Sequence, residues 1–120
     1  MIQQVIKTKS FQFGVDSYRA CAAIMKDKNE WVLTRQLMRS STAIGALCAE
    51  SDYAQSKLDF IHKRSIARKE CNESKYWIAM MNELGLMDEP SAKRLGIQAE
   101  ELMRLLTSGI RTAQQNLKTK

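Results

Sequence analysis

Seven apolar or small residues near the C-terminus advance along the chain in steps of three and four. They are Leu95, Ala99, Leu102, Leu106, Ile110 (or Gly109), Ala113 and Leu117. On an α-helix this spacing gathers them on one stripe, which is the pattern of a helix that packs against others in a bundle or coiled coil. The segment from about 89 to 117 is therefore expected to be one long helix with a buried face.

The rest of the chain has the composition of an all-helical protein. One proline and five glycines among 120 residues are too few for the many turns of a β-rich fold. The abundant Leu, Met, Ala, Lys and Glu all favour helices. A chain of this length fits a single domain, here residues 1–120.

Three further helices are expected, over residues 11–28, 31–53 and 56–84. The first two carry apolar stripes: Val15, Tyr18, Ala22 and Met25 in one, and Leu33, Leu37, Ile44 and Cys48 in the other. Helical spacing places each set on one face. Short connections favour antiparallel neighbours, so the predicted architecture is an all-α, up-down-up-down four-helix bundle.

Local signals mark the ends of the last two helices. Ser56 and Asp59 form a capping box with Asp in the place usually held by Glu or Gln. Gly85 is a natural C-terminal breaker. Asp88 is expected to cap the fourth helix, and Pro90 falls in its first turn, where a missing N–H is harmless.

Nothing in the sequence supports an enzyme, a metal site or a cofactor. His62 is the only histidine, and with Asp59 it makes a single Asp-x-x-His step, whereas di-iron bundles need two such motifs and further carboxylates. The five glycines are isolated, so no phosphate-binding loop is present. We expect a non-catalytic protein.

Cysteine spacing and hydropathy predict a cytoplasmic, soluble protein. Cys21, Cys48 and Cys71 are three in number and far apart, which argues for buried, reduced thiols rather than disulfides or a zinc knuckle. The N-terminus lacks the apolar core of a signal peptide. No apolar run reaches the ~18 residues of a membrane span.

Basic residues suggest a polyanionic partner. The net charge is +6 and the pI about 9.4, which makes RNA, DNA or an acidic protein surface plausible. The predicted phosphate contacts are Arg64, Arg68, Lys69, Lys75, Arg104, Arg111 and Lys118. The alternative is that these cations form ordinary solvated helix faces.

The third helix carries polar and aromatic residues beside its apolar stripe. A glutamate near that stripe must be paired, because an isolated buried carboxylate is costly. Arg39 on the second helix is a suitable partner for Glu70 or Glu73. Together with Glu50, Tyr76 and Trp77 these residues are predicted to form either an oligomer interface or ion pairs inside one bundle.

Two stretches resemble a known family. They are "LTRQLMRSSTAIGALCAES" (33–51) and "FIHKRSIARKECNESKYWIAMMNELGLM" (60–87), and they resemble the four-helix-bundle family of ribosomal RNA intervening-sequence proteins. In the first stretch Gln36, Arg39, Ser40, Ser41, Ile44, Ala49 and Glu50 match the family pattern, whereas Ala43, Gly45, Leu47 and Ser51 depart from it. In the second, Glu70, Asn72, Glu73, Tyr76 and Trp77 look like one branch, and the turn at 84–86 matches.

The resemblance implies a left-handed four-helix bundle that assembles as a homopentamer and has no established enzymatic activity. A related branch is the accessory protein of diversity-generating retroelements, in which a basic pentamer is thought to engage nucleic acid. Two hypotheses follow. The first is an oligomeric bundle that binds nucleic acid, with RNA favoured over DNA. The second is a homo-oligomeric scaffold or accessory protein that presents copies of one surface to a protein partner without binding nucleic acid.

Overall fold

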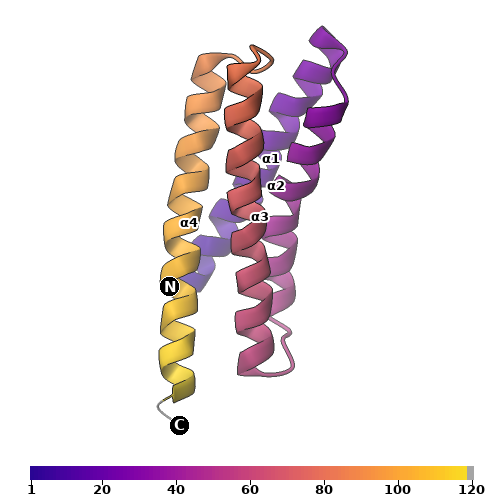
Figure 1. Cartoon of the computed structure of the whole chain (residues 1–120). Coiled ribbons are helices and arrows are strands. Elements are labelled where there is room, and N and C mark those ends of the chain that lie inside the picture. Colours follow the sequence, from indigo (N-terminus) through magenta and orange to yellow (C-terminus); the bar gives the residue numbers. More distant parts are fainter. Residues whose placement is uncertain (119–120) are drawn as a thin grey trace.

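The computed structural model describes residues 1–118, which form four α-helices (Figure 1). These are α1 (Ile2–Lys28), α2 (Val32–Ser51), α3 (Lys57–Glu83) and α4 (Glu89–Lys118). The described part of the chain contains no strand. The predicted all-α class is therefore confirmed, whereas the left-handed twist of the bundle stays a prediction.

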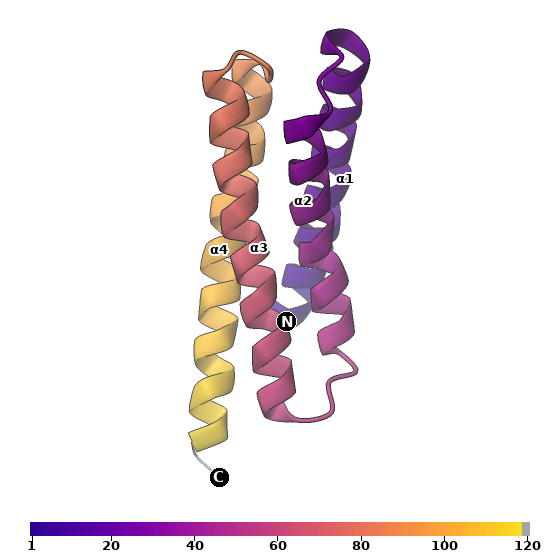
Figure 2. The same ribbon diagram turned by 45° about the vertical axis from the view of Figure 1, so that its right-hand side comes forward.

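The helices form an elongated rod of 53 × 21 × 20 Å. Each helix packs beside the one before it, with the chain turning back at each connection, and α4 also contacts α1 (Figures 1 and 2). Within the described residues the backbones of α1 and α3, and of α2 and α4, do not come within 8 Å of each other across the centre. Each helix therefore has two neighbours and an outward face.

The first helix is longer than the sequence predicted, since it begins at Ile2 rather than near Phe11. Ile6 and Phe13 are fully buried and Ser10 nearly so, which extends the inward stripe of α1 toward the N-terminus. Residue Met1 provides no side-chain cap, and β-branched residues with modest helix propensity occur here. Burial against the other helices, not a local signal, makes this segment helical.

The core lies along the α4 stripe identified from the sequence. Leu95, Ala99, Leu102 and Leu106 are essentially inaccessible to solvent, and Gly109 and Ile110 are both buried. The stripe ends there, because Ala113 and Leu117 are only half-buried. The last turns of α4 extend to the end of the bundle, where fewer side chains cover them.

The connections contain the predicted helix caps and one that was not predicted. Ser56 Oγ accepts a hydrogen bond from the Asp59 N–H (3.1 Å), and the Asp59 carboxylate accepts one from the Gln55 N–H (3.1 Å). Asp88 accepts one from the Ser91 N–H (2.8 Å). At the start of α2, the Glu30 carboxylate accepts the N–H groups of residues 32, 33 and 34, each at 3.1 Å. These bonds satisfy donors that a helix leaves unpaired at its start.

Gly85 ends α3 in the left-handed conformation. Its φ is +72°, a region that costs an L-residue about 1–2 kcal/mol. The Leu86 N–H then returns to the Met81 carbonyl (2.9 Å), and Lys28 Nζ donates to the Gly85 carbonyl (2.9 Å). The turn between α3 and α4 is thereby tied to the end of α1.

We expect Gly85→Ala to lower the free energy of unfolding by about 1–2 kcal/mol, because alanine is strained at this φ. Gly96→Ala is the matched control. Gly96 lies inside α4 with open space where a Cβ would stand, so alanine should stabilise by about 0.5–1 kcal/mol. Urea denaturation of both variants measures the difference, and equal effects would contradict the role of φ at Gly85.

Candidate functional site

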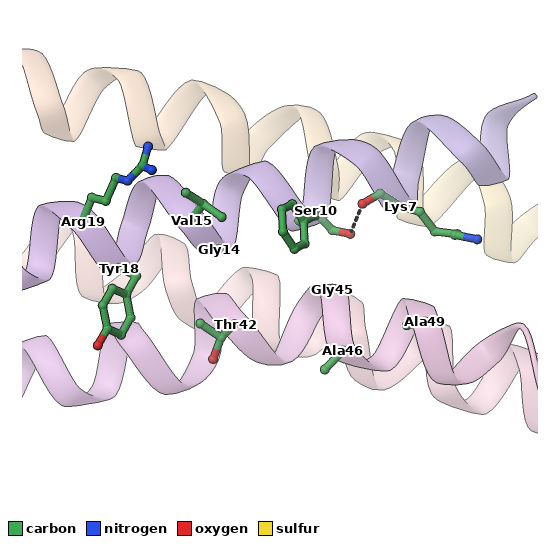
Figure 3. Close-up of a pocket in the computed structure, with 11 residues that line it drawn as sticks. Lys7, Ser10, Gly14, Val15, Tyr18, Arg19, Thr42, Gly45, Ala46 and Ala49 are labelled. Atoms are coloured by element: carbon green, nitrogen blue, oxygen red, sulfur yellow. Dashed lines mark hydrogen bonds between the residues drawn. The ribbon is translucent and has the colours of Figure 1, made fainter.

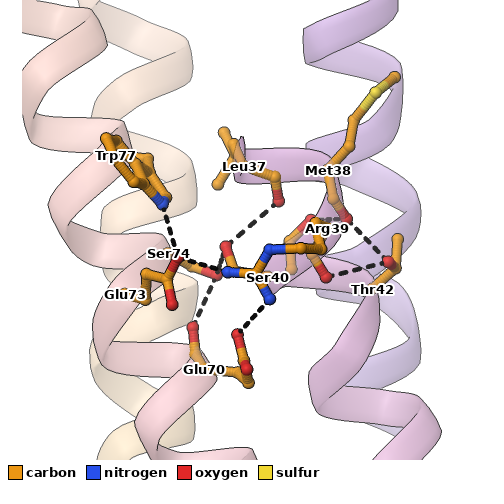
Figure 4. A network of polar contacts seen from close by, with 10 residues as sticks. Leu37, Met38, Arg39, Ser40, Thr42, Glu70, Glu73, Ser74 and Trp77 are labelled. Carbon is orange, nitrogen blue, oxygen red and sulfur yellow. Dashed lines mark hydrogen bonds and ion pairs between the residues drawn. The ribbon is translucent and has the colours of Figure 1, made fainter. Parts of the chain in front are cut away.

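A polar network joins α2 to α3 (Figure 4). The Arg39 guanidinium on α2 lies between two glutamates on α3: Nη1 is 3.1 Å from Glu70 Oε1, and Nη2 donates to Glu73 Oε2. Trp77 Nε1 donates to the same oxygen of Glu73 (3.1 Å). Arg39 therefore forms ion pairs with both of the glutamates for which the sequence analysis predicted a partner. Both ion pairs lie within one chain.

Buried hydroxyls continue this network into the core. Ser40 on α2 and Ser74 on α3 are both inaccessible, and their hydroxyl oxygens are 2.8 Å apart. Ser74 also donates to the Glu70 carbonyl (3.0 Å). These side chains are small, so the two helices approach closely while their polar atoms stay satisfied.

Electrostatic interactions in the network favour the charged forms of Glu73 and Arg39. The hydrogen bond from Arg39, followed by that from Trp77, lowers the pKa of the Glu73 carboxyl, and the bond to Glu73 raises the pKa of Arg39. The Tyr76 ring meets Trp77 edge-on at 5.1 Å but is largely exposed. The last member of the predicted set, Glu50, lies 3.7 Å from Lys63 of α3.

Three of the predicted phosphate contacts come together around Thr107. Arg68 on α3 donates to Thr107 Oγ1 (3.4 Å). A shallow pocket of about 270 Å³ on α4 is lined by Met103, Arg104, Thr107, Ser108 and Arg111, none of which is acidic. We call Arg68, Arg104 and Arg111 the arginine cluster. It combines three cations with two hydroxyl donors, a set suited to phosphate oxygens.

The other predicted phosphate contacts are not part of the arginine cluster. Lys75 lines a second pocket together with Arg104 and is paired with Glu100 (2.7 Å); this pair, and then the charge of Arg104, lowers the pKa of Glu100. Lys69 is exposed and its charge acts on Glu73, so it lies on the side of the Arg39 network. Lys118 is exposed in the last turn of α4.

Arg64 does not lie on the surface, contrary to the sequence-based prediction. Only 2% of it is exposed, and desolvation lowers the pKa of its guanidinium. Its position explains the error. Arg64 falls between Phe60 and Ala67 on the apolar stripe of α3, a placement that the sequence itself could have revealed. Arg64 is therefore not part of an exposed phosphate-binding face.

An apolar groove that the sequence analysis missed lies between α1 and α2 (Figure 3). Its volume is about 520 Å³, and its lining includes Phe11, Tyr18, Gly45 and Ala46. Phe11 is 70% exposed and Tyr18 54%, and the Tyr18 ring extends from α1 toward α2. We call this surface the aromatic groove. Gly45 lies against the α1 backbone, since a Cβ there would be 3.5 Å from the Phe11 nitrogen.

The cysteines are buried and free, as predicted. Burial raises the pKa of Cys21 and Cys71 to about 12 and also raises that of Cys48. Thiols with raised pKa values are poor nucleophiles at neutral pH. Among residues 1–118, no three His, Cys, Asp or Glu side chains are arranged to hold a metal ion. In the same part of the chain, no helix is long and apolar enough to cross a membrane.

These features define a class, a helical bundle whose outward faces carry a basic cluster and an apolar groove. The chain belongs to the 23S rRNA-intervening sequence protein family, whose model matches residues 3–108. A similar solved structure is a protein of unknown function from the S23 ribosomal protein family of Bacteroides thetaiotaomicron. It is 33% identical, with a TM-score of 0.90 over 92% of this chain and 99% of that one. Comparison with curated proteins gives no match.

Replacing Arg39 tests whether its ion pairs stabilise the fold. We expect Arg39→Met to lower the free energy of unfolding at pH 7 by about 1 kcal/mol or less, since the arginine is half-exposed. A carboxylate whose folded pKa is depressed stabilises above its unfolded pKa and loses this contribution as pH falls through the folded value. The difference between variant and wild type should therefore shrink well below pH 4.5, the ordinary value for Glu73.

Denaturant unfolding at pH 7 and pH 3 measures this difference. Arg94→Met is the control, because Arg94 is exposed on α4 and outside this network. An Arg39→Met deficit of equal size at both pH values would show that the arginine stabilises by packing rather than by charge.

Proposed function

We propose that this chain is a non-catalytic, cytoplasmic protein that binds RNA as a homo-oligomer. The observation that carries the proposal is the arginine cluster, in which Arg68 of α3 donates to Thr107, and Arg104 and Arg111 of α4 line a pocket with Thr107 and Ser108. The family description, which refers to an intervening sequence of 23S rRNA, favours RNA over DNA. The three buried thiols suit a reducing compartment.

RNA binding through this cluster would be electrostatic and would show little sequence specificity. Arginine contacts to phosphates release counterions, which contributes about 0.7–0.9 to the salt slope for each phosphate neutralised. Three contacts per subunit correspond to a slope of about two to three. Among the described residues, no aromatic ring lines the pocket at the arginine cluster, so base stacking there would add little.

We expect the double variant Arg104→Gln/Arg111→Gln to bind a structured RNA more weakly and with a salt slope smaller by about 1.4–1.8 per subunit. Fluorescence anisotropy at several salt concentrations measures both quantities. Arg94→Gln is the matched control, because it also removes one exposed α4 arginine but lies outside the cluster. An unchanged slope in the double variant, or an equal loss in the control, would contradict RNA binding at this cluster.

Self-association is the second part of the proposal. The aromatic groove exposes Phe11 and Tyr18 beside small residues of α2, and exposed apolar patches of this kind favour association. We propose that copies of the chain meet at this groove, in the pentamer that the family resemblance implies. The same groove also favours the alternative function, a scaffold that binds a protein partner and not RNA.

Charged substitutions in the groove should separate the subunits without unfolding them. We expect Phe11→Asp/Tyr18→Asp to reduce the mass in solution to that of a monomer, while the circular dichroism spectrum stays helical, because both side chains are largely exposed. Sedimentation velocity gives the mass. Tyr53→Asp is the control, since Tyr53 is 90% exposed and lies outside the groove. A wild-type monomer would refute self-association.

A further inference from the structure

Arg64 is a buried cation that forms no ion pair with any of residues 1–118. Its Nε donates to Ser51 Oγ (2.8 Å), and its Cζ lies 4.7 Å from the centre of the Phe60 ring. Its Nη2 is buried and has no hydrogen-bond partner among the described residues. Asp52 acts on Arg64 only through its field and forms its own ion pair with Lys7 at 2.7 Å.

An unpaired buried charge is costly. Removing an ion from water carries a penalty of several kcal/mol unless a partner compensates it. The stacking with Phe60 and the single bond to Ser51 offset part of this penalty. An apolar residue at position 64 would fill the same stripe without this desolvation penalty. A bound anion would compensate the buried charge of the guanidinium.

A pocket adjoins the two residues that hold this guanidinium. It has a volume of about 320 Å³ and lies between the α2–α3 connection, the start of α3 and the end of α4. Its lining includes Ser51, Ser56, Lys57, Phe60 and Ala113. We call it the foot pocket. Ser51 and Phe60 belong both to its wall and to the immediate surroundings of Arg64.

The surroundings of the foot pocket are electropositive. No acidic residue appears among the described residues that line it. Lys57 is exposed at its edge, and the N-terminus of the 27-residue helix α3 adds its partial positive charge. Asp59, in the first turn of α3, is bonded to the Gln55 N–H (3.1 Å) and lies 3.8 Å from Lys63.

We propose that the foot pocket binds a phosphate group, with Arg64 as its buried positive charge. Lys57 and the hydroxyl proton of Ser56 supply further donors, since Ser56 Oγ accepts from the Asp59 N–H and its own proton is left to donate. Nη2 is buried, and Arg64 is not among the described residues that line the pocket, so direct contact requires side chains beside it, such as the Phe60 ring stacked on the guanidinium, to move. The site is separate from the arginine cluster and does not depend on RNA binding there.

Titration of the full chain with inorganic phosphate, against chloride at matched ionic strength, tests the site. Arg64→Met removes the charge, and Ala113→Phe fills the pocket from a half-buried position without altering Arg64. We expect phosphate to bind the wild type and to raise its melting temperature. Both variants should weaken binding at least about tenfold, the effect of losing a charge-assisted bond. Arg94→Met should bind as the wild type does.

If Arg64→Met fails to fold, Ala113→Phe still tests the proposal. Absence of phosphate binding by the wild type, or undiminished binding by a folded Ala113→Phe, would overturn the proposal. A short RNA with and without a 5′-phosphate then identifies the source of the ligand. A preference for the phosphorylated RNA that Ala113→Phe abolishes assigns the site to a nucleic-acid end. Equal binding of the two RNAs, with inorganic phosphate still bound, assigns it to free phosphate.

Discussion

Burial of one apolar stripe per helix is the constraint on which the rest of this structure depends. Each fully buried Leu, Ile or Phe stabilises by about 1.5–3 kcal/mol, and such residues follow one side of each helix, as Leu95, Leu102 and Leu106 do in α4. Since each helix contacts only two neighbours, its outward side takes no part in the core. Those outward sides carry the arginine cluster and the aromatic groove.

The two outward surfaces place different chemistry on different pairs of helices. The α3–α4 side carries Arg68, Arg104 and Arg111, whereas the α1–α2 side carries Phe11 and Tyr18 over a floor of small residues. An assembly that uses the apolar side for contacts between subunits leaves the basic side open to solvent. Self-association and RNA binding are therefore compatible within one chain, and association would multiply the basic surface without new contacts.

Most of the fold could be predicted from periodicity and helix caps, because these signals are local. The α4 stripe, the Ser56 cap and the Gly85 stop depend on residues a few positions apart, and all three are present. The predicted start of α1 was wrong because Ile2–Ser10 becomes helical through tertiary burial. The aromatic groove was missed because it requires knowing which faces of α1 and α2 meet, which no single helix reveals.

The two arginines near α3 show why site prediction was less successful than fold prediction. Arg39 was predicted to pair with a glutamate, and it does so. Its side chain is half-exposed, so both water and two carboxylates stabilise its charge. Arg64 was assigned to the surface because of its residue type, although its register on α3 places it inside. A paired arginine at the surface can be explained by stability alone. A buried arginine with an unsatisfied nitrogen opposes stability, and binding of an anion would offset that cost.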